Sequence, residues 1–278
     1  MRCGVLTMTA GDTKQVASMS TSLKRLPFSL RLATTGINAA LYASVGLLWV
    51  AFPLTVFGVR FWPQVFVPAT FAVLFGPWTG GIGAAIGIFL ADVIYGHHDA
   101  LLSLLVGVPA NFLGFFIIGW LPSRRLTGLA RKVLLIISLL IPGALAGYGI
   151  SLLSDAVSPQ YLVAVIGLVA VLAILGLTAL RNRWADFEIA ASIGLGVGSI
   201  IIGIGIVAYS SLFTLPAVLN LGSGPLPTGF IYAATAFTYL SEIPFLVVLT
   251  PPVVAASKAA FPSLGAYATT REAQAKPR

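Results

Sequence analysis

Charged residues are scarce in this sequence. Asp, Glu, Lys and Arg make up 9% of its 278 residues, whereas hydrophobic residues make up 58%. A soluble domain carries about 25% charged residues, so this chain has too few to cover its surface in water. The apolar runs are also too long and too uniform for the alternating strands of a membrane barrel. We therefore expect a helical integral membrane protein, because a helix satisfies its backbone hydrogen bonds within one segment.

The common signatures of catalysis are also missing. Cys3 is the only cysteine, which excludes an internal disulfide. The sequence has no Walker A motif, no HExxH pair and no serine nucleophile elbow. Residues 203–208 have the glycine spacing of a dinucleotide-binding loop, but they lie inside an apolar run, which favours helix packing. We expect a protein that is not an enzyme and needs no cofactor.

Eight apolar runs indicate an all-α, polytopic bundle in the cell membrane, since a crossing helix needs about 20 apolar residues. The runs cover roughly residues 33–56, 64–76, 78–95, 101–121, 132–154, 160–180, 189–213 and 229–257, and the second is short. The second and third meet at a Gly76-Pro77 turn signal. This pattern divides the chain into a disordered cytoplasmic tail (1–32), a transmembrane domain (33–257) and a second cytoplasmic tail (258–278).

The positions of the basic residues predict the orientation. If the N-terminus is cytoplasmic and all eight runs cross, every one of the 16 Lys and Arg residues except Arg60 lies on the cytoplasmic side. Cytoplasmic loops of membrane proteins are rich in Lys and Arg. Both termini are therefore expected in the cytoplasm. The net charge of +8 reflects this pattern, and we do not expect a nucleic acid as a partner.

Polar residues gather at the predicted outer end of the third run. Asp92 and Tyr95 precede the pair His97 and His98. A carboxylate within a membrane segment is costly and often functional, although Asp92 at an interface is also compatible with simple solvation. The two histidines are the only ones in the chain, so solvation or contact with a ligand is favoured over a metal site.

A second polar group lies in the last run. Thr235, Thr238, Tyr239 and Glu242 share one helical face, and Pro244 frees a backbone carbonyl beside it. Such a face beside a kink is typical of a substrate-site wall in transporters. A polar contact between helices is the alternative interpretation.

Small residues and one amide indicate close helix packing. Asn111 lies on one face with Gly107 and Gly114, where hydrogen bonding across a helix interface is favoured over ligand contact. Ala39 and Ala43 form a small-xxx-small pair in the first run. A longer series follows in the third run, at Thr79, Gly83, Gly87 and Ala91. The sequence leaves open whether these faces pack internally or against another protein.

Residues 33–121 resemble the substrate-binding S components of energy-coupling factor (ECF) transporters. The resemblance rests on FGPWTGGIGAAIG at 75–87, on Asp92 and on GVPANFLG at 107–114, with a short helix before the turn. It implies a subunit that captures a vitamin or a precursor from outside. A transmembrane T subunit would dock at Ala39 and Ala43, and two cytoplasmic ATPases would supply energy. Asp92, Tyr95, His97, His98 and Asn111 would line the small-molecule site.

The resemblance does not cover the second half of the chain. The family is built on six helices, whereas eight runs are counted here, and runs five to eight carry no matching motif. The parts that Glu242 and Tyr239 play in a site are therefore expected from the residues alone. Two alternatives stay open. One is a stand-alone secondary transporter or channel that uses Asp92 or Glu242 as an ion site. The other is an assembly factor or a membrane enzyme.

Overall fold

The computed structural model describes residues 27–50, 55–57, 59–95, 100–124, 128–151, 184–219, 221 and 224–261. Helices account for 87% of the residues it describes. Within that part, four helices are long and apolar enough to cross a membrane. They span Pro77–Ile94, Ala100–Ser123, Ala185–Leu212 and Phe230–Ala260. The chain is therefore a mostly helical membrane protein.

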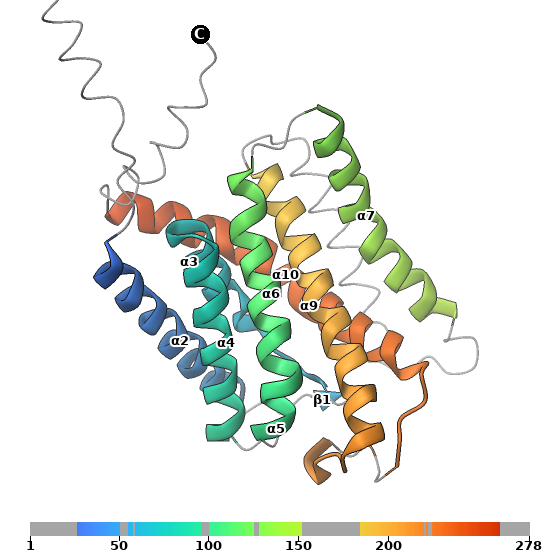
Figure 1. The fold of residues 1–278 in the computed structure, drawn as a ribbon. Coiled ribbons are helices and arrows are strands. Elements are labelled where there is room, and N and C mark those ends of the chain that lie inside the picture. The colour runs from blue at the N-terminus through green and yellow to red at the C-terminus, as the bar shows by residue number, and fades with distance from the viewer. Residues whose placement is uncertain are drawn as a thin grey trace, which may run out of the picture.

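The first half of the chain forms a long helix, a small hairpin and a helical pair (Figure 1). Its elements are α2 (Phe28–Val50), β1 (Thr55–Val56), β2 (Val59–Arg60), the 3-10 turn η1 (Pro63–Val65), α3 (Phe66–Phe75) and α4 (Pro77–Tyr95). The hairpin is antiparallel, with Thr55 opposite Arg60. Phe57 at its tip has φ 53°, a left-handed conformation that tight hairpin turns require.

The described part of the second half forms four helical stretches. The first is continuous from α5 (Ala100–Leu102) through the π-helical segment η2 (Ser103–Gly107) and α6 (Val108–Trp120) to η3 (Leu121–Ser123). The other three are α7 (Gly128–Ser151), α9 (Ala185–Leu212) and α10 (Phe230–Ala260). The 3-10 turn η4 (Ala217–Leu219) lies between α9 and α10. Figure 1 shows α10 running obliquely behind α6 and α9, which lie side by side in the front layer.

Seven of the eight expected apolar runs contain helices in the structure. The predicted end of the first run was wrong, because α2 ends at Val50 and Thr55–Val56 form strand β1. The sixth, residues 160–180, lies outside the described residues, as does most of each expected tail. The second run forms α3, which has 10 residues and is shorter than the roughly 20 that a membrane crossing needs.

The predicted turn between the second and third runs is present. Gly76 has φ 100°, and its N–H donates to the carbonyl of Ala72. Only glycine adopts this conformation without strain. Pro77 then begins α4, where its fixed φ is compatible with the first helical turn. The two residues thus end α3 and reverse the chain into α4.

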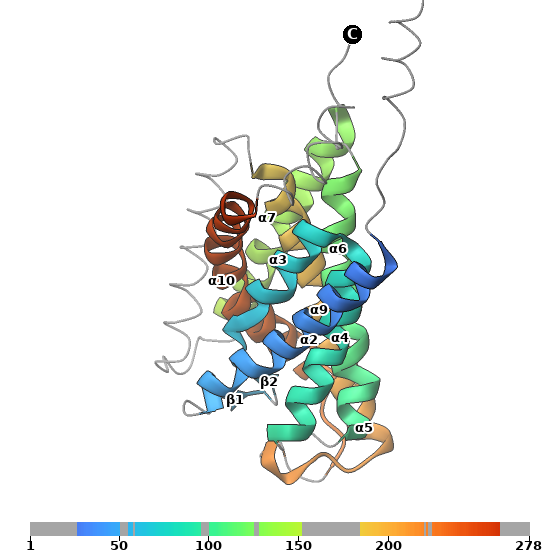
Figure 2. The same cartoon turned by 90° about the vertical axis from the view of Figure 1, so that its left-hand side faces the viewer.

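The small residues of α4 pack internally against α2. Asn38 donates its amide hydrogens to the carbonyls of Thr79 and Gly80, at 3.0 and 3.3 Å. A Cβ at Gly87 would lie 2.9 Å from the carbonyl of Ala39. The α4 glycines therefore allow close contact between the two backbones. Figure 2 shows α2 and α4 adjacent.

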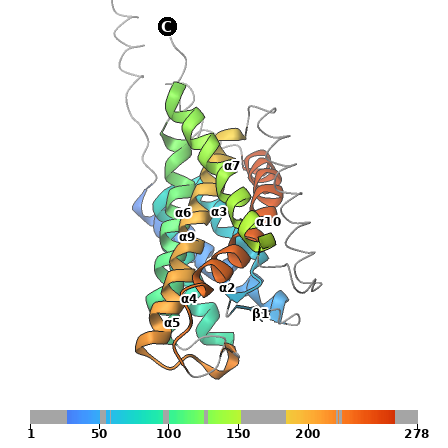
Figure 3. The same ribbon diagram turned by 90° about the vertical axis from the view of Figure 1, so that its right-hand side faces the viewer.

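Glycines also set the contact between α6 and α9. A Cβ at Gly194 would lie 2.6 Å from the carbonyl of Gly114, and one at Gly198 would lie 3.2 Å from that of Ala110. Gly203 and Gly205, from the segment with dinucleotide-like spacing, lie within α9 and face α10 and η2 in the same way. In contrast, α7 packs on the outside of α9 and α10, as Figure 3 shows.

Candidate functional site

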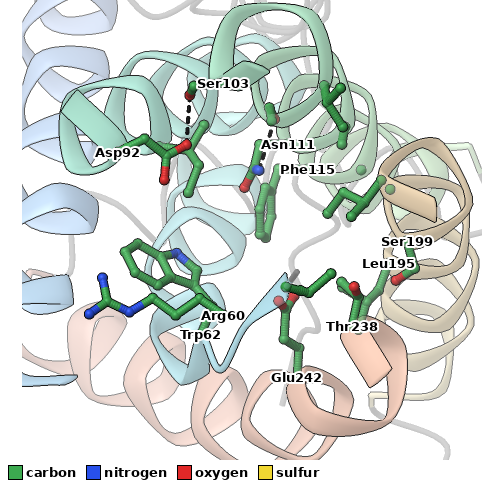
Figure 4. Close-up of a pocket in the computed structure, with 18 of the residues that line it drawn as sticks. Arg60, Trp62, Asp92, Ser103, Asn111, Phe115, Leu195, Ser199, Thr238 and Glu242 are labelled. Carbon is green, nitrogen blue, oxygen red and sulfur yellow. Dashed lines mark hydrogen bonds between the residues drawn. The ribbon is translucent and has the colours of Figure 1, made fainter. Parts of the chain in front are cut away.

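A cavity of about 90 Å³ lies inside the bundle, between α2, β2, α4, the α5–α6 stretch, α9 and α10. Figure 4 shows its wall, in which polar groups interrupt a mostly apolar lining. The polar and aromatic residues of this wall are Tyr42, Arg60, Trp62, Asp92, Ser103, Asn111, Phe115, Ser199, Thr238 and Glu242. One water needs about 10–15 Å³ of such space, so the cavity has room for several waters or a small organic molecule.

Asp92 is buried in this wall, with 5% of its surface exposed. Ser103 donates its hydroxyl hydrogen to Asp92 Oδ2 at 2.6 Å. Ser103 begins the π-helical segment, and such segments are frequent at functional sites because they redirect side chains. A Cβ at Gly107 would lie 3.4 Å from Asp92 Oδ2, so the glycine leaves space beside the carboxylate. Asp92 is therefore buried and hydrogen-bonded in the cavity wall rather than solvated at a membrane interface.

Asn111 lines the cavity and also links two helices. Its Oδ1 accepts a hydrogen bond from Tyr42 Oη of α2 at 2.8 Å, and its Nδ2 donates to the carbonyl of Gly107 at 2.9 Å. Tyr42 makes edge contacts with Trp62 and Phe115, with ring centroids 6.2 and 6.0 Å apart. The expected bond across a helix interface is present, and it fixes an aromatic corner of the wall.

The polar face of α10 is divided between two roles. Thr238 and Glu242 line the cavity. Tyr239 instead lies within the α9–α10 interface, where its hydroxyl is 2.7 Å from that of Ser192. Thr235 donates to the carbonyl of Ser199 at 3.3 Å. Two residues of this face therefore line the cavity, two make contacts between helices, and Tyr239 lies outside the cavity.

Arg60 is a cavity residue that the sequence did not single out as part of the site. It lies in β2 with 6% of its surface exposed, and its guanidinium is 5.6 Å from the centre of the Trp62 ring. The hairpin is held by Phe57, whose ring packs edge-on against Phe230 at 5.8 Å. One signal was available in the sequence: Arg60 is the only basic residue expected on the outer side.

The other expected outer residues are only partly placed. Tyr95 is the last residue of α4, and nothing further of it is described. His97 and His98 lie outside the described residues. Within the described part, no group of three or more His, Cys, Asp and Glu residues is arranged to hold a metal ion.

The two alanines expected to dock a partner are buried inside the chain. Ala39 and Ala43 are 4% and 6% exposed, because α4 packs on them. A partner helix could reach them only if α4 moved away. The exposed side of α2 carries its own series of small residues, Gly36, Ala40 and Ser44, spaced four apart. A Cβ at Gly36 would meet nothing within 4 Å.

No family model matches this sequence, and neither the curated proteins nor the solved structures compared with it contain a match. The site is therefore interpreted from its own geometry. It joins two carboxylates, one guanidinium, several hydroxyl groups and three aromatic rings in one small cavity. Such a set suits the capture of a small polar molecule, because a few placed polar groups orient a ligand that apolar walls enclose.

Proposed function

We propose that this chain is the membrane-embedded, substrate-binding subunit of an uptake transporter for a micronutrient such as a vitamin or a precursor. It has no catalytic activity of its own, and separate ATPase subunits supply the energy. The observation that carries this proposal is the cavity inside the helical bundle, whose wall contains Asp92, Glu242 and Arg60. Burying three ionisable groups in one cavity is costly, and binding of a polar ligand is a function that would retain them.

The arrangement of helices supports the resemblance to ECF S components. Six helices, α2, α3, α4, α6, α9 and α10, pack on one another around the cavity or next to it, whereas α7 packs outside on α9 and α10. No α7 residue whose side chain is described lines the cavity. Among the described residues, the helix beyond these six therefore lies at the periphery.

The described basic residues favour an outward-facing cavity. Arg31 lies at the start of α2, Arg124 follows η3, Arg131 and Lys132 lie near the start of α7, and Lys258 lies near the end of α10. Figure 1 shows these helix ends at one end of the bundle, whereas the hairpin that carries Arg60 is nearer the other. With the basic end in the cytoplasm, the cavity faces the outside and is placed to capture an external ligand.

The exposed small residues of α2 supply a docking face for a T subunit. Gly36, Ala40 and Ser44 form a strip of small side chains on the outer side of the bundle. Strips of Gly, Ala and Ser let a second membrane helix approach closely, and a serine hydroxyl can also bond across the contact. This face replaces Ala39 and Ala43 in the proposal, because those two are covered by α4.

A stand-alone secondary transporter is the second candidate. The observation in its favour is that Asp92 and Glu242, on different helices, line the same cavity, as expected of an ion site coupled to a substrate site. The two candidates differ in energy source. Accumulation of substrate in vesicles under an ion gradient alone would support the second, whereas dependence on ATP and on partner subunits would support the first.

Retention of a ligand by the isolated chain tests the binding function. Native mass spectrometry of the chain, purified without partners, should show one small-molecule adduct per chain. Asp92→Asn should abolish this adduct, because it removes the charge that Ser103 holds in the wall. Glu188→Gln is the control, since Glu188 is a buried carboxylate of α9 outside the cavity. An adduct that survives Asp92→Asn unchanged, or a chain that never carries one, would count against the proposal.

A further inference from the structure

Among the described residues, the charges in the cavity wall do not cancel. Asp92 and Glu242 are acidic, and Arg60 is the one basic residue among the described residues of the wall. With all three ionised, the wall carries a formal charge of 1 − 2 = −1. A charge held in a small, mostly apolar cavity is costly unless an opposite charge accompanies it. A bound ligand is one source of that charge.

Glu242 is the carboxylate positioned to meet a ligand. Figure 4 shows Arg60 and Asp92 on one side of the cavity, and Glu242 on the other side with its carboxylate directed inward. Its side chain is 7% exposed. Within the described part of the chain, no hydrogen bond or ion pair involves this carboxylate. Its oxygens therefore have capacity for several donors.

Two other groups of the cavity wall can also accept hydrogen bonds. Thr238, one turn earlier on α10, gives its hydroxyl hydrogen to the carbonyl of Ala234 at 2.8 Å, so its oxygen can still accept. Ser199 lies in the wall on α9, and its hydroxyl has no hydrogen-bond partner among the described residues. A primary ammonium carries three N–H donors and no acceptor, which complements this set. The buried rings of Tyr42, Trp62 and Phe115 suit the body of an organic cation.

We propose that the cavity selects small organic amines, and that Glu242 is the counter-ion of the ligand's primary ammonium group. This inference deepens the proposed function, on which it rests for the identity of the site. A ligand of the same shape that carries a carboxylate or a neutral alcohol in place of the ammonium would not pair with Glu242 in this way. Arg60 and Asp92 lie on the other side of the cavity from Glu242.

Three probes with the same carbon skeleton test the charge preference. They are 3-methylbutylammonium, 3-methylbutanol and 3-methylbutanoate, titrated by calorimetry into the full chain in detergent. Ligands this small are expected to bind in the millimolar range. The ammonium should bind about 10-fold more tightly than the alcohol, as one charge-assisted hydrogen bond provides, and the carboxylate should bind least tightly. Glu242→Gln should reduce the preference for the ammonium to near parity, whereas Glu188→Gln should leave it unchanged.

If Glu242→Gln does not fold, the order in which the unaltered chain binds the three probes still tests the inference. Equal or tighter binding of the alcohol or the carboxylate, failure of all three probes to bind, or a preference that persists in Glu242→Gln would overturn the inference. These results are distinct from failure of the proposed function. A chain that prefers the ammonium but never associates with ATPases would retain the ligand class and lose the transport assignment. A chain that associates with ATPases but shows no preference for the ammonium would retain the transport assignment and lose the ligand class.

Discussion

Tyr42 of α2 and Asn111 of α6 are joined by a hydrogen bond of 2.8 Å between the phenol hydroxyl and the amide Oδ1. The bond spans the cavity wall and connects segments 69 residues apart in sequence. Asn111 in turn donates to Gly107, next to the carboxylate of Asp92. The position of α2 is therefore coupled to the geometry of the acidic side of the site.

Tyr42→Phe should destabilise the protein. The ring contacts with Trp62 and Phe115 remain, but the half-buried Asn111 Oδ1 loses its donor. An acceptor without a partner costs about 1–3 kcal/mol when it is fully buried, and less in this position. Thermal unfolding in detergent measures this loss. Ser257→Ala on α10 is the control, because its hydroxyl is exposed and bonds to the carbonyl of Val253 in the same helix. An equal effect of the two substitutions would show that the bond to Asn111 contributes nothing specific.

Gly194→Ala and Gly36→Ala should have opposite effects on stability. A Cβ at Gly194 would lie 2.6 Å from the Gly114 carbonyl, so α6 and α9 must separate, whereas a Cβ at Gly36 meets nothing within 4 Å. Overpacking costs about 1–3 kcal/mol, and replacing an exposed helical glycine by alanine gains about 0.5–1 kcal/mol. Unfolding temperatures of the two variants measure both. A Gly194→Ala variant as stable as the unaltered chain would contradict the close α6–α9 contact.

Cavity residues should react with a thiol reagent added from outside. In a Cys3→Ser background the chain has no other cysteine, so Ser103→Cys and Thr238→Cys introduce single labels in the wall. A membrane-impermeant methanethiosulfonate should modify both in intact cells. Ser192→Cys is the control, because Ser192 contacts Tyr239 in the α9–α10 interface and does not line the cavity. Labelling only from the cytoplasmic side would reverse the proposed orientation.

Much of the fold could be predicted from apolar runs and turn residues. Gly76-Pro77 ends one helix and begins the next, as the chemistry of the two residues dictates. Asp92 and Glu242 could be selected because a carboxylate in a membrane segment needs a polar environment. Their presence in one cavity could not be predicted, since it depends on how α4 and α10 are placed in space.

Three assignments depended on information that the sequence does not contain. Ala39 and Ala43 face α4 rather than a partner. The sequence could not distinguish the two, because a face of small residues suits close packing against either helix. Tyr239 turns to Ser192 of α9, although it shares a broad polar face with Glu242. Arg60 reaches the cavity only because a short hairpin folds back over the bundle, and that hairpin has no apolar periodicity to reveal it.

Co-purification from native membranes tests the central claim most directly. The chain, tagged at its C-terminus, should bring down a transmembrane T subunit and two ATPase chains. Ala40→Leu with Ser44→Leu, which adds bulk to the exposed strip of α2, should lose them. The matched control is Ala130→Leu with Ala144→Leu on the exposed face of α7, which should retain them. Purification of the unaltered chain without any ATPase, under conditions that preserve other membrane complexes, would contradict the account and direct attention to ion-driven transport through Asp92 and Glu242.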